Sequence, residues 1–195
     1  MNEHIKPSKI SGSKARGNMP KHNPDRPPSD FYPTPDYATT AILQAEPFPG
    51  VIWEPACGDG AMVEVMKKFG HERVIPTEKY FWDYGEMGVD FLTSSRDCDH
   101  IVTNPPFNLA EEFARHALAV ARWKVALFLP LTFLEAEERR GFFKNYPPAR
   151  VHVFCKRVTL YPKNHSDDSK GRGGRAHAWF VWDKTHIGPS CLCWL

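Results

Sequence analysis

The sequence predicts an α/β fold in which helices cover both faces of a mostly parallel sheet. Short apolar segments typical of buried strands alternate with segments of helical periodicity from about residue 38 onward. The segment from Lys124 to Leu129 is nearly all apolar, which is typical of a parallel strand buried on both faces. The last two candidate strands have no helix between them, so we expect them to pair antiparallel.

The candidate elements follow one another at short intervals. We expect strands at residues 51–53, 73–77, 100–103, 124–129, 150–158 and 177–182, with a short element at 89–92 that completes a seven-stranded sheet. Helices are expected at residues 38–45, 61–69, 109–122 and 134–145. Gly70 suits the end of the second helix, and two prolines end the strand at 100–103.

Composition divides the 195 residues into an arm and one domain. Residues 1–29 are polar and almost lack large apolar side chains, so we expect a disordered basic arm. Residues 30–195 have the globular pattern of a single domain. No apolar run approaches the roughly 18 residues of a membrane span, and the N-terminus has no hydrophobic signal segment. We therefore expect a cytoplasmic protein with no membrane association.

The five cysteines are odd in number and irregularly spaced. They do not form a disulfide framework, and no histidine completes a recognisable metal-ligand spacing with them. We expect free thiols and no metal.

Positive charge is concentrated in two segments. Residues 1–29 contain six Lys and Arg against two acidic residues, and residues 156–175 have the same balance. Such clustering is typical of nucleic-acid contact, although solvated flexible segments are often Lys-rich as well. The candidate phosphate contacts in the second segment are Lys163, Lys170, Arg172 and Arg175.

Acidic residues and a glycine loop follow the first strands. Gly58 and Gly60 lie between a strand and a helix, where they allow a ligand to approach the backbone. Glu54 ends the first strand and suits a ligand with an ammonium or sulfonium group. Glu78 lies about 20 residues beyond the glycine loop, where an acid usually accepts ribose hydroxyls.

Asp90 and Phe91 complete this candidate cofactor site, because Asp90 can accept from an adenine amino group while Phe91 covers a ring face. Each signal has a plain alternative. A lone G-x-G is weak, Glu78 can be an ordinary exposed residue, and Asp90 can be a helix cap. Their order on successive strand ends favours a nucleoside-bearing cofactor.

The segment Asn104-Pro105-Pro106-Phe107 is the most specific in the chain. The prolines make a stiff turn whose carbonyls can accept hydrogen bonds, and Asn104 adds a side-chain acceptor. Two acceptors can grip the hydrogens of an exocyclic amino group, while Phe107 stacks on the base. The alternative is a Pro-Pro turn that only ends a strand, with Asn104 as a helix cap.

These motifs together resemble the class I S-adenosylmethionine-dependent methyltransferases, and in particular the small phage- and prophage-type N6-adenine DNA methyltransferases. The resemblance covers about residues 30–182 and implies a Rossmann-like fold. It implies that Asn104, Pro105, Pro106 and Phe107 are catalytic. It also implies that S-adenosylmethionine is held by Tyr32, Thr34, Pro35, Glu54, Ala56, Gly58, Gly60, Glu78, Asp90 and Phe91.

The chain departs from this family in having no insertion long enough for a separate target-recognition domain. The resemblance therefore implies adenine-specific methylation of DNA with a short or relaxed recognition sequence. Two alternatives stay open. The same fold and tetrapeptide serve methylation of a guanine amino group in ribosomal RNA or of a protein glutamine, and a nucleic-acid-binding module can keep the fold without the chemistry.

Overall fold

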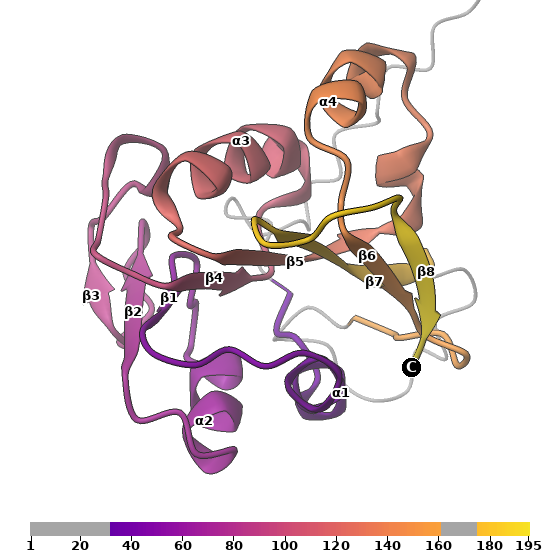
Figure 1. The fold of residues 1–195 in the computed structure, drawn as a ribbon. Helices are drawn as coiled ribbons and strands as arrows, with labels where there is room; N and C mark the ends of the chain where they lie inside the picture. Colours follow the sequence, from indigo (N-terminus) through magenta and orange to yellow (C-terminus); the bar gives the residue numbers. More distant parts are fainter. Residues whose placement is uncertain (1–31, 161–174) are drawn as a thin grey trace, which may run out of the picture.

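The computed structural model describes residues 32–160 and 175–195. An eight-stranded sheet lies between two layers of helices (Figure 1). The predicted basic arm at residues 1–29 lies outside the described residues, as do Lys163, Lys170 and Arg172. The strands are β1 (Ile52–Glu54), β2 (Val74–Glu78), β3 (Glu86–Met87), β4 (His100–Thr103), β5 (Lys124–Pro130), β6 (Arg150–Val153), β7 (His177–Asp183) and β8 (Cys191–Trp194). The α-helices are α1 (Asp36–Ala45), α2 (Ala61–Lys68), α3 (Ala110–Val120) and α4 (Arg140–Asn145).

The sheet has the order β3-β2-β1-β4-β5-β7-β6-β8 and confirms the mostly parallel prediction. Strands β2, β1, β4 and β5 pair in parallel. Strand β7 runs antiparallel to both of its neighbours, β5 and β6, as expected for the last predicted strand. The carboxyl ends of β1, β2 and β4 therefore meet at one edge of the sheet.

The sheet differs from the prediction at three places. It has eight strands rather than seven, because the four residues of β8 add an edge strand parallel to β6. The expected element at 89–92 is not a strand: Asp90 caps the short 3-10 helix η1 (Phe91–Thr93), and the two-residue strand β3 precedes it. The strand expected at 150–158 ends at Val153.

Each face of the sheet carries its own apolar core, and Figure 1 shows the helices that cover the two faces. On one face α1 and α2 pack against alternate strand residues that include Val102, Phe128 and Trp179. On the other face α3 and α4 pack against the intervening residues, among them Ile101, Leu127 and Phe180. This strict alternation is what a strand buried on both faces requires. No helix within residues 32–160 and 175–195 is long and apolar enough to span a bilayer.

The helix expected at 134–145 is broken into pieces. The residues from Leu131 to Arg139 form two 3-10 turns, and the α-helix begins only at Arg140. Ala136 has an extended backbone, and Arg139 donates from its guanidinium to the Phe133 carbonyl at 2.8 Å. The helical prediction is thus correct only for the second half of the segment, where α4 runs from Arg140 to Asn145.

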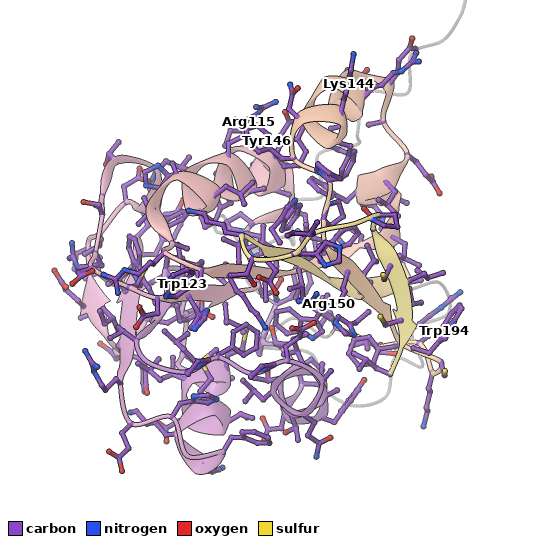
Figure 2. All side chains as sticks on the ribbon, viewed as in Figure 1. Arg115, Trp123, Lys144, Tyr146, Arg150 and Trp194 are labelled. Atoms are coloured by element: carbon purple, nitrogen blue, oxygen red, sulfur yellow. The ribbon has the colours of Figure 1, made fainter. Side chains whose placement is uncertain are left out.

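A largely buried ion network joins the end of α1 to the sheet, and Arg150, which is labelled in Figure 2, contacts both of its carboxylates. Glu46, which follows α1, accepts hydrogen bonds from His152, Arg150 and Lys124. Asp183 accepts from Arg150 at 2.8 Å on the other side. Burial alone would raise the pKa of Glu46, but hydrogen bonds from these cationic and imidazole groups hold it at about 2. The network fixes α1 to β5, β6 and β7.

We expect Glu46→Gln to lower the free energy of unfolding by about 3 kcal/mol at neutral pH, because it leaves the half-buried Lys124 and Arg150 with Asp183 as their remaining counter-ion in the network. The pKa of Glu46 is depressed in the folded state, so the contribution of its carboxylate is fully present above pH 4.5 and is lost as pH falls toward 2. Urea denaturation of both proteins across this range measures the difference. The exposed Glu72→Gln serves as a control, and a difference independent of pH would contradict the assignment.

Candidate functional site

A cavity of about 310 Å³ lies at the carboxyl edge of β1, β2 and β4. Its walls come from the segment before α1, the turn after β1, the loop after β2, η1 and the turn after β4. The cavity brings together ten of the residues that the sequence singled out. These are Tyr32, Thr34, Glu54, Ala56, Glu78, Asp90, Phe91, Asn104, Pro106 and Phe107.

Glu54 is completely buried at the end of β1. One carboxylate oxygen accepts from the Ala56 N–H at 3.1 Å, and the other, Oε2, has no hydrogen-bond partner among the described residues. The neighbouring Thr103 hydroxyl makes no hydrogen bond of good geometry within the described residues, although it lies near enough to Glu54 to lower the pKa of that carboxyl. Burial raises the pKa of Glu54 to about 8, and the nearby Glu78 adds to the rise. The site therefore contains a carboxyl group that a cationic ligand would ionise.

Glu78 is held at the end of β2 by two backbone donors. Its Oε2 accepts from the Gly58 N–H at 2.9 Å, and its Oε1 accepts from the Tyr80 N–H at 3.0 Å. Glu78 is 6% exposed, so it is not the ordinary surface residue of the alternative interpretation. Each oxygen keeps acceptor capacity for a second donor, which a ligand hydroxyl can use.

Asp90 and Phe91 stabilise the local structure as well as lining the site. Asp90 caps η1 by accepting from the Leu92 N–H at 3.1 Å, and its second oxygen pairs with Lys79 at 2.8 Å. The hydrogen bond from Lys79 lowers the pKa of Asp90. The Phe91 ring packs edge-on against Trp53 and is 2% exposed. The alternative raised for Asp90 by the sequence is thus present, because Asp90 is a cap. Phe91 belongs to the core as well as to the cavity wall, which the sequence did not indicate.

Asn104 follows β4 and is fixed by the segment before α1. Its Nδ2 donates to the Tyr32 carbonyl at 3.0 Å and to the Thr34 hydroxyl at 2.9 Å. Its Oδ1 is buried and has no hydrogen-bond partner within residues 32–160 and 175–195. Asn104 is therefore not a helix cap: its side chain keeps a desolvated acceptor beside the cavity.

The prolines after Asn104 form the stiff turn that the sequence predicts. The Pro106 carbonyl is already occupied, because it accepts from the Leu109 N–H at 2.9 Å. The expectation that the carbonyls of this turn are all free is wrong at that position. Phe107 begins a 3-10 turn and lies against His177 at the start of β7, with ring centroids 5.4 Å apart. His177 stacks in turn on Phe128, and burial lowers its pKa to about 4.

Four of the predicted catalytic and cofactor-binding residues do not line the cavity. Pro35 precedes α1, where its carbonyl accepts from Ala38 and Thr39. Gly58 serves the site through its N–H to Glu78. Gly60 has a φ of +85°, and a Cβ there would lie 2.5 Å from the Tyr84 ring, so it admits a side chain of the protein rather than a ligand. Pro105 is buried below the turn.

The sequence analysis missed the aromatic segment after β2. Tyr80 and Trp82 line the cavity beside Lys79, and Phe81 between them is 81% exposed. The sequence could have indicated this segment, because three consecutive aromatic residues closely follow a strand that ends in Glu78, and exposed rings near a pocket suit flat ligands. In the described part of the chain no cluster of three His, Cys, Asp or Glu residues could hold a metal ion, and all five cysteines are free.

Solved structures share this architecture at low sequence identity. A protein from Listeria monocytogenes, assigned as a class I S-adenosylmethionine-dependent methyltransferase, matches with a TM-score of 0.59 and 12% identity over 83% of this chain and 65% of that chain. A type I restriction-modification methyltransferase subunit from Streptococcus thermophilus matches with a TM-score of 0.55 and 12% identity over 80% of this chain and 46% of its own. The fold is that of the class I methyltransferases.

A protein from Pyrococcus horikoshii assigned as an RNA methyltransferase gives a TM-score of 0.59 at 14% identity, with 80% of this chain and 87% of that chain covered. The present chain spans less than two thirds of the length of the Listeria and Streptococcus proteins. No protein-family model and no curated protein sequence matches it. At these identities the likeness establishes the fold alone.

We expect Glu54→Gln to stabilise the ligand-free protein in alkaline solution. The pKa of Glu54 is raised in the folded state. As pH rises from 4.5 to about 8, Glu54 ionises in the unfolded chain but not in the folded protein, and the free energy of unfolding of the native protein falls progressively. The stability gain of the variant should be absent in acid and largest above pH 8. Urea denaturation across this range, with the exposed Glu135→Gln as control, measures it. A variant less stable at every pH would show that the native carboxyl is satisfied within the fold.

Proposed function

We propose that this chain transfers a methyl group from S-adenosylmethionine to the N6 amino group of adenine in DNA, as the small phage- and prophage-type enzymes that it resembles do. One observation carries the proposal. The buried Asn104 Oδ1 lacks a partner among the described residues, and Asn104 lines the same cavity as Glu54, whose Oε2 is also unpaired there. Buried acceptors without partners are rare in folded proteins, and two at one cavity suit a ligand that donates.

The residues present fit S-adenosylmethionine. Glu54 Oε2 offers a desolvated carboxylate to the cofactor ammonium, and Glu78 offers acceptors to ribose hydroxyls. Asp90, Tyr80 and Trp82 line the same cavity and would hold the adenine of the cofactor. When bound, the cofactor supplies an electrophilic methyl group: the lone pair of the target nitrogen forms the new N–C bond while the C–S bond breaks with its electrons on sulfur.

The residues after β4 make a poor nucleophile reactive. The lone pair of an aromatic amine is delocalised into the ring. Hydrogen bonds from its two N–H groups, one to Asn104 Oδ1 and the other to a second acceptor such as a backbone carbonyl, would draw the nitrogen toward tetrahedral geometry. Phe107, whose ring lies against His177, would stack on the base. Catalysis then rests on positioning and on acceptors fixed before the reaction, and the methylated nitrogen releases its proton to water.

DNA is the favoured substrate for two reasons. The Tyr32-Pro33-Thr34-Pro35 segment resembles the DNA-methylating group, and one structural neighbour belongs to a restriction-modification system. Adenine in a duplex would have to be flipped out of the stack to reach Phe107. The candidate contacts Lys163, Lys170, Arg172 and Arg175 stay a prediction from sequence. RNA is the second candidate, because another neighbour is assigned as an RNA methyltransferase.

The decisive experiment incubates the protein with methyl-labelled cofactor and, separately, with DNA, RNA and protein. Label in DNA, recovered as N6-methyladenine after digestion to nucleosides, is the expected result. Label only in RNA or only in protein would replace the substrate and keep the chemistry. Absence of label together with absence of cofactor binding would leave a binding module that has the fold without the activity.

We expect Asn104→Ala to reduce turnover by about a thousandfold or more, because it removes an acceptor that acts on the reacting nitrogen. Affinity for S-adenosylmethionine should stay nearly unchanged, since this amide meets the amine rather than the cofactor. Single-turnover kinetics and calorimetric titration of the cofactor separate the two effects. Normal turnover at saturation with lost cofactor affinity would refute this role for Asn104.

A further inference from the structure

We propose that Thr34 is a positioning residue that orients the Asn104 amide, in addition to any contact of its segment with the cofactor. The inference rests on the proposed function, because it assigns Asn104 Oδ1 to the reacting amine. The family resemblance implies only that Tyr32, Thr34 and Pro35 close over the cofactor. The geometry points to a second role, in which this segment sets the direction of the catalytic hydrogen bond.

The contacts use both donors of the amide. Asn104 Nδ2 carries two hydrogens, and two acceptors lie within bonding distance, the Tyr32 carbonyl at 3.0 Å and the Thr34 hydroxyl at 2.9 Å. Thr34 is 4% exposed, so water does not readily replace its hydroxyl. With the nitrogen held in this way, Oδ1 is the part of the amide left for a ligand.

The orientation matters because an amide has a donor end and an acceptor end. A carbonyl such as that of Tyr32 can only accept, so it selects the nitrogen of Asn104 as its neighbour. If the amide turned over, Oδ1 would face the Tyr32 carbonyl, and Nδ2 would present hydrogens to an amine that also donates. That arrangement would be repulsive on both sides. The Tyr32 carbonyl therefore selects the orientation that can accept from an amino group, and the Thr34 hydroxyl, which can donate or accept, holds the amide in that orientation.

The Thr34 hydroxyl is held in place by the structure around it. Pro33 and Pro35 fix the backbone on either side. The Pro35 carbonyl then accepts from the Ala38 N–H at 2.9 Å as α1 begins. Trp179 on β7 donates to the Ala38 carbonyl at 2.9 Å, which ties the start of α1 to the sheet. Asn104, at the end of β4, is thus oriented by a segment that the sheet itself anchors.

The test compares three variants of the full chain. Thr34→Val keeps the shape of the side chain and removes the hydroxyl, whereas Thr34→Ser keeps the hydroxyl. Thr39→Val is the matched control, because Thr39 is equally buried and its hydroxyl has no hydrogen-bond partner within the described residues. We expect Thr34→Val to lower kcat by about tenfold or more with cofactor Kd changed by less than about twofold. Thr34→Ser should restore turnover, and Thr39→Val should match the native protein.

A second measurement does not depend on turnover. Side-chain amide exchange, followed by NMR with the Asn104 signals identified through Asn104→Ala, should be slow in the native protein and faster in Thr34→Val. If native protein methylates no substrate, the proposed function fails, and amide exchange alone decides the positioning role. Unchanged exchange in Thr34→Val would overturn it. So would lost cofactor affinity with native turnover at saturation, or equal damage from Thr34→Ser and Thr34→Val.

Discussion

The site depends on the parallel pairing of β1, β2 and β4. Parallel strands end at the same edge of a sheet. Residues that are distant in sequence therefore lie close together because of strand pairing, and strong contacts between the residues themselves are not required. Glu54 ends β1, Glu78 ends β2, and Asn104 follows β4. Strand pairing supplies the coarse placement, and hydrogen bonds from neighbouring loops then set the direction of each side chain.

Sequence reasoning found the strand ends and missed the orientations. The alternation of apolar segments located β1, β2, β4, β5 and β7 because burial on both faces leaves a clear composition. It gave no sign of β8, because four apolar residues are too few to show a strand pattern, although three of them are exposed on the sheet edge. Two kinds of detail were missed. Asp90 and Phe91 each have a structural role as well as a place in the site, and the Thr34 hydroxyl contacts Asn104. These features depend on side-chain rotamers and on partners far along the chain, and the spacing of residues in a sequence specifies neither.

Two buried glutamates show how the same side chain serves opposite purposes. Glu46 and Glu54 are each at most 4% exposed. Glu46 is surrounded by cationic and imidazole donors, which hold its pKa at about 2, and it ties α1 to the sheet. Glu54 has one backbone donor and an unpaired oxygen, and burial raises its pKa to about 8. A carboxyl group that is fully satisfied stabilises the fold, whereas one that is left unsatisfied at a cavity keeps its binding capacity for a ligand.

The placement of β7 between β5 and β6 has a consequence for how the chain folds. Strand β6 is made before β7, yet its sheet partners are β7 and β8, and it does not pair with β5. During synthesis β6 therefore has no neighbour to join until residues 177–183 emerge and pair with β5. Over the same interval, the side of β5 that later pairs with β7 has no partner strand. Completion of this half of the sheet is a late, long-range event, and such events are slow and leave strand edges exposed to other chains.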